Sequence, residues 1–337
     1  MAKVQLQVLK SGITSAAVAH PQRLCAMLAE QHGVSHSTMG KWLRLLIDEG
    51  WLVREGTSRP VYRPGLWRDV SRSYALAGLD EQTPWERDFA PCFSLSPNVT
   101  RLAHYAFTEL LNNAVDHSGG SRVSVSMRQN RTHLHLLMRD DGCGVLERIR
   151  TAFQIDNPQL ALLELSKGKL TTQPDFHTGR GLFFTSRLFE VFDLYANGLT
   201  YQRNDWKRGG WLKASPAQAP GTAIFMSLSL NSPRTLEEVF VAHAKGADDL
   251  SFSRTEVAMR LAHAEGEKLE SRGQAKRIAA RLESFDSVDL DFEGVDVIGQ
   301  AFADELFRVF PRRSPQVQLN PRNMSSAVAA MVAQTLE

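Results

Sequence analysis

Four polar side chains share one face of a helix that the sequence predicts over residues 102–117. Glu109, Asn113 and Asp116 are spaced by four and three residues, and His117 follows directly. Side chains at these intervals project from the same side of an α-helix. Apolar residues fill many of the other positions, so the helix also packs and its polar face should border a cleft. There the carboxylates can accept protons, and the amide oxygen can bind a hard cation.

A glycine-rich segment follows a predicted strand at residues 133–139. Asp140, Gly142 and Gly144 form a DxGxG pattern there. A carboxylate at a strand end can accept a hydrogen bond from a ligand, and glycine lets the backbone turn tightly. Taken alone, this pattern is more typical of an ordinary acidic β-turn.

A second glycine-rich segment, Gly179-Arg180-Gly181-Leu182, opens a predicted helix. The unpaired backbone amides and the positive end of the helix dipole at such a position favour an anion. Glycine lets the anion approach closely, and Arg180 can add a positive charge. Further on, the last predicted strand of this region, residues 222–228, begins at the threonine of a Gly-Thr pair.

The order of these segments resembles the Bergerat ATP-binding fold. FTELLNNAVDHS, RDDGCGV and HTGRGLFFTSR, which begin at residues 107, 139 and 177, are similar to the N, G1 and G2 boxes of that fold, and PGTAIFMSL matches its later Gly-Thr pair. The fold is shared by gyrase, DNA mismatch-repair ATPases, histidine kinases and anti-sigma-factor serine kinases. The resemblance implies that the chain binds ATP and Mg²⁺.

The resemblance also implies roles for individual side chains. Asn113 would hold the Mg²⁺ ion that bridges the phosphates, and Glu109, a second group at this ion, would act as general base on water or on an acceptor hydroxyl. Asp140 would accept a hydrogen bond from the exocyclic amine of adenine, and Thr222 would lie near the adenine through a water molecule. The other implied nucleotide contacts are Asp116, His117, Gly142, Gly144, Gly179, Arg180, Gly181 and Leu182.

The stretch between the second and third boxes corresponds to the ATP lid of this fold, a loop that closes over the nucleotide. Lys167 and Lys169 flank Gly168 within this stretch. Both lysines are candidate phosphate contacts in the closed state. The alternative, a pair of solvated surface lysines, stays open.

Composition limits the class of protein. A chain of 337 residues with 43% hydrophobic and 23% charged residues is typical of a soluble protein with two or three domains. No apolar run approaches the roughly 18 residues that span a bilayer. The first residues lack the apolar stretch of a signal peptide, so we expect a cytoplasmic protein without membrane contact. Three separated cysteines fit neither a disulfide framework nor a zinc site.

The N-terminal segment is basic, with ten Lys/Arg against five Asp/Glu in residues 1–75. Residues 21–56 show two helical patterns followed by a strand, and a turn and second strand come next, an order that resembles a winged helix-turn-helix. Ser35 is placed to cap the second helix. The candidate contacts to double-stranded DNA are His36, Ser37, Thr38, Lys41, Arg44 and, on the wing, Arg59. Protein docking and a merely solvated helix face are the alternatives.

Beyond residue 250 short strands alternate with helices, which predicts an α/β domain. VDLDFEGVDVIGQAFADELF, from residue 288, resembles the core of a STAS-like domain, the class that includes anti-anti-sigma factors. Where phosphorylated members of that class carry a serine, this chain has Gln300 and Ala301, so its tail is not an obvious phosphate acceptor. Asp304 and Glu305 should form an acidic helix face that suits a protein partner.

The sequence therefore predicts a multidomain α/β protein of the α+β type. The expected parts are a winged helix over 1–66, a connector over 67–98, a Bergerat ATP-binding domain over 99–232 and a STAS-like domain over 250–337. The favoured function is an ATP-controlled DNA-binding regulator with slow ATP hydrolysis.

The alternative function is an anti-sigma-type protein serine/threonine kinase that acts on a separate protein. An autophosphorylating histidine kinase ranks lower, because no helix with a phospho-accepting histidine is recognised before the ATP domain. A nucleotide-binding scaffold without turnover also stays open, and so does a homodimer.

Overall fold

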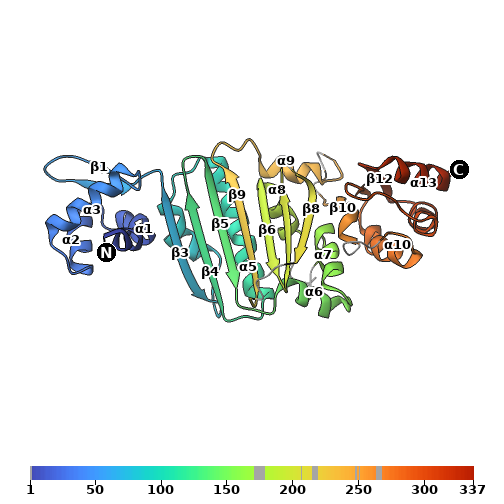
Figure 1. The fold of residues 1–337 in the computed structure, drawn as a ribbon, viewed down its shortest axis with the longest axis horizontal. Coiled ribbons are helices and arrows are strands. Elements are labelled where there is room, and N and C mark those ends of the chain that lie inside the picture. The colour runs from blue at the N-terminus through green and yellow to red at the C-terminus, as the bar shows by residue number, and fades with distance from the viewer. Residues whose placement is uncertain are drawn as a thin grey trace. The chain divides into compact units, whose positions relative to one another are not determined.

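The computed structural model describes residues 2–170, 179–205, 207–214, 219–246, 249, 251–262 and 268–337 (Figure 1). They belong to two compact units, Met1–Gly142 with Ala223–Pro233, and Cys143–Thr222 with Arg234–Glu337. Helices and strands occur in both units, which confirms the predicted mixed α/β, multidomain class. Within the described ranges, no helix combines the length and the apolar character needed to cross a membrane.

The first unit begins with three helices and a β-hairpin. The helices are α1 (Ala2–Ala19), α2 (Leu24–Gln31) and α3 (His36–Asp48), and β1 (Leu52–Glu55) pairs with β2 (Val61–Pro64) in antiparallel fashion. The Ser35 hydroxyl accepts a hydrogen bond from the Thr38 N–H at 3.1 Å, so Ser35 caps α3 as predicted.

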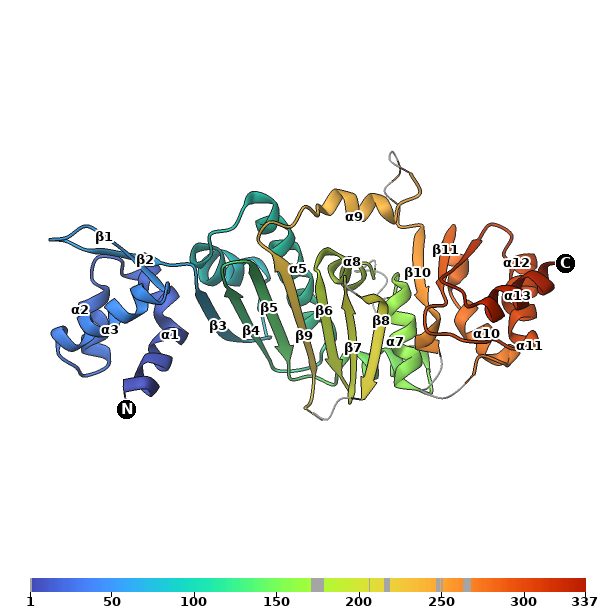
Figure 2. The ribbon, with the colours of Figure 1, turned by 45° about the horizontal axis from the view of Figure 1, so that its top comes forward.

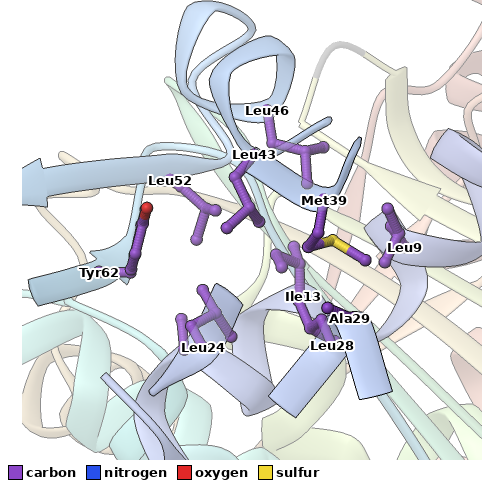
Figure 3. Close-up of a cluster of buried hydrophobic side chains, with 11 residues drawn as sticks. Leu9, Ile13, Leu24, Leu28, Ala29, Met39, Leu43, Leu46, Leu52 and Tyr62 are labelled. Carbon is purple, nitrogen blue, oxygen red and sulfur yellow. The ribbon is translucent and has the colours of Figure 1, made fainter. Parts of the chain in front are cut away.

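A cluster of buried apolar side chains joins these elements (Figure 3). Helix α1, which the sequence pattern did not predict, contributes Leu9, Ile13 and Ala17 at intervals of four residues. This spacing directs one face of α1 into the cluster. The other buried members are Leu24, Leu28, Ala29, Met39, Leu43, Leu46, Leu52 and Tyr62.

The rest of the first unit is an antiparallel sheet with a long helix. Strands β3 (Arg68–Ala75), β4 (Arg122–Gln129), β5 (His133–Asp140) and β9 (Thr222–Ser229) pair in this order. Helix α5 (Pro97–His117) packs against β5 (Figure 2). Ser96 caps α5 by accepting a hydrogen bond from the Val99 N–H, so the helix starts five residues earlier than predicted.

The predicted connector over residues 67–98 is corrected by the structure, because it contains strand β3. This strand pairs with β4 along its whole length, from Arg68 opposite Gln129 to Ala75 opposite Arg122. Only Val70 within β3 is buried, so the strand lacks the apolar alternation by which strands are recognised. Short helical turns follow at Gln82–Pro84 (α4), Trp85–Phe89 and Ala90–Cys92.

The second unit starts with helices and a second antiparallel set of strands. The helices are α6 (Val145–Phe153), α7 (Pro158–Lys167), α8 (Gly181–Leu188) and α9 (Leu236–Ala242). The strands are β6 (Val191–Ala196), β7 (Leu199–Asn204) and β8 (Lys207–Ala214), paired in this order. The apolar side chains of α7 and α8 face the core of this unit, so both helices are fixed by packing.

The second unit ends in a parallel sheet, β10 (Arg254–Ala258), β11 (Ser287–Asp291) and β12 (Gln318–Arg322), in this order. The α-helices of this part are α10 (Arg272–Ala279), α11 (Gln300–Ala303), α12 (Phe310–Arg313) and α13 (Ser326–Leu336), with Asp304–Val309 continuing α11 into α12. Turns of 3-10 helix lie at Met259–Ala262 and Leu282–Ser284. The predicted alternation of strands and helices is present.

The acidic helix face predicted at Asp304 and Glu305 is corrected by the structure. Glu305 is buried, with 6% of its surface exposed. Asp304 pairs with Arg308 at 3.2 Å, which neutralises the charge of Asp304. These two residues therefore do not form an exposed acidic surface.

Candidate functional site

Helix α5 carries the polar residues of the first segment on one side. Glu109, Asn113, Asp116 and His117 are all partly exposed. The opposite side of α5 is buried, and its largest buried side chain is Phe107. The helix therefore packs by one face and presents the other, as expected. One carboxylate and one amide oxygen suit a Mg²⁺ ion that is held mainly by phosphates and water.

Asp140 ends strand β5 and begins a tight turn. Its Oδ1 accepts a hydrogen bond from the Gly142 N–H at 2.9 Å, and Asp140 is only 8% exposed. A Cβ atom on Gly142 would lie 2.2 Å from the carbonyl oxygen of Ser118, the C-cap residue of α5. The first unit thus brings the end of the predicted N segment against the predicted G1 segment, and glycine is required at that contact.

Asp141 has a structural role that differs from the role of Asp140. Its carboxylate accepts hydrogen bonds from the Ser121 N–H and hydroxyl, both at 2.7 Å, and from the Arg122 N–H at 2.9 Å. The bond from the Arg122 backbone, followed by those from Ser121, lowers the pKa of Asp141 to about 2. Asp141 therefore fastens the turn to the start of β4.

The second unit brings two further predicted residues together. The Thr222 hydroxyl accepts a hydrogen bond from the Val145 N–H at 2.9 Å, directly after Gly144. Gly144 has φ +88°, and a Cβ there would lie 2.4 Å from the Asn197 side-chain oxygen. Asn197 also donates to the Cys143 carbonyl at 2.9 Å and accepts from the Glu147 N–H at 3.1 Å.

Asn197 is a residue that the sequence analysis missed. It holds the start of α6 beside Gly144 from the turn between β6 and β7. The Asn197-Gly198 pair is itself a strong signal for a two-residue hairpin turn. That dipeptide could have located the hairpin, although not its contact with α6.

The third segment also depends on a glycine. Gly179 has φ +65°, and a Cβ there would lie 2.6 Å from backbone atoms of Leu170. Arg180 precedes α8, which begins at Gly181 and continues with Leu182. The Arg180 Nε is buried without a hydrogen-bond partner among the residues that the structure describes. A buried, unpaired guanidinium nitrogen beside a helix N-terminus suits an anion.

Lys167 and Lys169 occupy places other than those expected of phosphate contacts. The Lys167 ammonium is fully buried and donates to Glu164 and, at 3.0 Å, to the Ala280 carbonyl. Lys169 donates to the Ser284 carbonyl, and its ammonium lies 4.4 Å from the centre of the Phe285 ring. Burial lowers the pKa of both lysines. Because these contacts engage both ammonium groups, we leave the two lysines out of the nucleotide site.

Comparison with known families gives two matches along the chain. Residues 98–230 match the family described as histidine kinase-, DNA gyrase B-, and HSP90-like ATPase. The chain contains a GHKL-type ATPase domain. This match covers Glu109, Asn113, Asp140 and Thr222 together with the G2 segment. Residues 274–329 match the STAS-like domain of unknown function, and a search of curated proteins finds no match to the chain.

The N-terminal helices lie before both family matches. On α3, His36, Ser37, Lys41 and Arg44 are exposed, whereas Thr38 is partly covered and its N–H bonds to Ser35. On the hairpin, Arg59 is exposed. The neighbouring Arg63 pairs with both oxygens of Glu55 at 3.0 Å, and Arg54 donates to the Thr57 carbonyl at 2.9 Å.

Proposed function

We propose that this chain is a cytoplasmic regulator in which an ATPase domain controls a DNA-binding winged helix. The match of residues 98–230 to GHKL-type ATPases supports ATP binding. The observation that carries the proposal furthest is the G1 turn, where the buried Asp140 carboxylate stands beside Gly142, a glycine with no room for a side chain. This is the combination of acceptor and close backbone that adenine recognition needs.

Each polar residue of the proposed site has a separate chemical role. Asp140 accepts the hydrogen bond of the adenine amine, and Thr222 lies near the base. Asn113 would hold Mg²⁺, which would supply positive charge to offset that of the phosphates. Glu109, the second group proposed for the ion, would take the proton of the attacking water. Asp116 and His117 line the site near the ribose or a phosphate.

The G2 segment supplies the proposed phosphate contacts. Gly179 and Gly181 leave the backbone accessible, and the amides at the start of α8, with Leu182, can donate to phosphate oxygens. A phosphate would also pair the buried Arg180 Nε. Slow hydrolysis, followed by release of ADP and inorganic phosphate, then returns the regulator to its unliganded state.

The proposed DNA interface is the polar face of α3. His36, Ser37, Lys41 and Arg44 are exposed there, and the helix is anchored from its opposite face by the buried cluster. A rigid helix with exposed basic and hydroxyl groups can enter a major groove, while Arg59 on the hairpin reaches a phosphate. Three helices followed by a two-stranded hairpin support the winged-helix assignment.

The start of α11 favours a switch over a kinase that phosphorylates its own tail. This helix begins at Gln300, with Gly299 as its N-cap, so no hydroxyl occupies the position of the acceptor serine. The STAS-like domain then serves as a docking module for a protein partner. A kinase that acts on a separate protein is the competing proposal.

Incubation of the chain with γ-labelled ATP separates the proposals. Slow release of labelled inorganic phosphate supports the ATP-dependent switch. Transfer of the label to a second protein from the same cells would contradict the switch and support the kinase proposal. If ATP binds but neither phosphate release nor labelling of a second protein is observed, the chain is a nucleotide-binding scaffold and the proposed hydrolysis is rejected.

A further inference from the structure

Arg281 connects the STAS-like domain to the end of α7. Its guanidinium donates to a Glu164 oxygen at 2.8 Å, to the Gly168 carbonyl at 3.0 Å and to the Lys169 carbonyl at 2.7 Å. Arg281 belongs to the STAS-like match, whereas its three acceptors belong to the ATPase match. Its φ of +64° is uncommon for a residue with a side chain, so the surrounding contacts hold it in place.

Lys167 makes the reciprocal connection. Its ammonium donates to Glu164 and to the Ala280 carbonyl, which follows the last residue of α10. A positive charge at a helix C-terminus offsets the partial negative charge of the helix dipole. In return, the Thr255 hydroxyl of β10 donates to the Lys167 carbonyl at 2.6 Å, at the C-terminus of α7. Lys167 of α7 therefore caps the C-terminal end of α10, and Thr255 of β10 caps the C-terminal end of α7.

We call Glu164, Lys167 and Arg281 the latch. Lys167 is fully buried, and the side chains of Glu164 and Arg281 are 11% and 26% exposed. One carboxylate between two cations leaves no buried charge without a partner. Removal of Glu164 would leave the buried Lys167 ammonium without an opposite charge, so the latch differs from a surface ion pair.

The segment held by the latch lies against the G2 box. Leu170 follows Lys169, whose carbonyl accepts a hydrogen bond from Arg281. The backbone of Leu170 packs closely on Gly179, where a Cβ atom on the glycine would lie 2.6 Å from Leu170 backbone atoms. The positive charge of Arg180 also contributes to the lowered pKa of Lys169, after burial. A displacement of Gly168–Lys169 would therefore reach Gly179 and Arg180.

An aromatic contact makes a second connection to the same place. Phe183 of α8, two residues after Gly181, lies 4.5 Å between ring centres from Phe252, and Phe252 lies 5.3 Å from Phe285. A Cβ on Gly168 would lie 2.7 Å from Phe252 and 2.9 Å from Phe183. The helix that begins in the G2 box thus packs on Phe252, which packs in turn on Phe285 of the STAS-like match, and Gly168 of the latched segment lies against the rings of Phe183 and Phe252.

We propose that the latch sets the position of the G2 segment, so that the STAS-like domain controls the affinity of the ATPase domain for nucleotide phosphates. This inference rests on the proposed ATP site. Arg281 acts as a positioning residue, because it contacts the backbone before the G2 box and not the nucleotide. Coupling of this kind is reciprocal: nucleotide binding stabilises the latch, and a partner that opens the latch at α10 weakens nucleotide binding.

The test compares Arg281→Asn and Arg281→Lys with the unchanged full-length chain. Asparagine tolerates a positive φ and removes the guanidinium, whereas lysine keeps the charge but lacks the planar fork of donors that reaches the three acceptors at once. Arg308→Gln is the control, because Arg308 pairs with Asp304 in the same domain at an exposed position. Calorimetry with Mg²⁺ measures the Kd values of ADP and of a non-hydrolysable ATP analogue, and hydrogen exchange follows residues 158–170 and 272–285.

We expect both Arg281 variants to bind the ATP analogue at least about fivefold more weakly, with a smaller loss for ADP. Exchange in residues 158–170 should increase. The analogue should protect residues 272–285 in the unchanged chain and in the control only. A general loss of stability would instead reduce the affinities for ADP and for the analogue by the same factor.

Equal affinity in all four proteins would overturn the inference and leave the ATP site in place. If the Arg281 variants lose the same affinity for ADP as for the analogue, the inference is also overturned. The same holds if the analogue does not slow hydrogen exchange of residues 272–285 in the unchanged chain. If the unchanged chain binds neither nucleotide, the proposed function fails, and the inference fails with it.

Discussion

The backbone of Gly142 lies directly against the carbonyl of Ser118, where a Cβ would come within 2.2 Å of the oxygen. Because backbone atoms cannot move aside as the end of a side chain can, Gly142→Ala should lower the stability of the chain by about 1–3 kcal/mol. It should also weaken ATP binding, since Asp140 is positioned by its bond to the Gly142 N–H. Thermal unfolding and ATP titration measure the two effects.

Gly12→Ala is the matched control for this substitution. Gly12 lies within α1, and a Cβ there would meet no atom within 4 Å. Alanine is favoured over glycine inside a helix, so this variant should unfold at the same temperature or higher. An equally mild result for Gly142→Ala would contradict the close contact with Ser118.

Glu109→Gln should separate binding from turnover. Glutamine keeps the size of the side chain but cannot take a proton from water, so the hydrolysis rate should fall by about 10²- to 10⁴-fold. The affinity for Mg²⁺-ATP should change little, because Asp140 and Asn113 remain. Phosphate release and equilibrium binding measure both values. Undiminished hydrolysis would show that Glu109 is not the base.

Duplex DNA binding by the N-terminal helices should weaken steeply as salt rises. Neutralised phosphates release counterions, and removal of one phosphate contact should reduce the salt slope by about one. Lys41→Ala and Arg44→Ala each remove an exposed cation of α3, and Lys276→Ala removes an exposed cation of α10 as a control. Binding that is absent, or unaffected by salt, would favour a protein-docking role for this part of the chain.

Acid should destabilise the packing of His243, whose ring lies edge-on to Phe183 with 4.9 Å between the ring centres. Burial, with a contribution from Arg187 and smaller ones from Arg203 and Arg254, lowers the pKa of His243 to about 3. The unfolded chain takes up this proton near pH 6.5, so the stabilisation is complete above that pH and is lost as pH falls toward the folded value. One unit below the unfolded pKa, the loss is about 1.4 kcal/mol.

Chemical denaturation at two pH values tests this effect with His243→Asn. Asparagine cannot titrate in this range, and its amide can replace the Nδ1 contact to the Arg254 carbonyl, which is 3.1 Å long. The variant should lose less stability between about pH 6.5 and 5.5 than the unchanged chain. The same loss in both proteins would place the acid sensitivity elsewhere.

Features that depend on residues close together along the chain could be predicted from the sequence. The Ser35 cap of α3, the polar face of α5 and the glycine turns all follow from local spacing and backbone requirements. Strand β3 could not be predicted, because it is polar and its partner β4 lies about fifty residues further along. Its place in the sheet is decided by pairing and not by its own pattern.

The positions of Lys167 and Lys169 illustrate the same limit at the site. Two lysines beside a glycine before a G2-like segment suggested phosphate contacts, and nothing local indicated burial. Their partners, Ala280 and Ser284, are more than a hundred residues away, as is Arg281 from Glu164. Only the packed structure brings these charges together.

Titration of Mg²⁺-ATP into the unchanged chain and into Asp140→Asn tests the central claim most directly. Asparagine keeps an oxygen that can accept a hydrogen bond from the Gly142 N–H, so the turn persists. It replaces the second carboxylate oxygen by an NH2 group, which is a donor and cannot accept a hydrogen bond from the adenine amine. We predict saturable binding to the unchanged chain and no detectable binding to a variant that unfolds at the same temperature. Equal ATP affinity in the two proteins would contradict the nucleotide site.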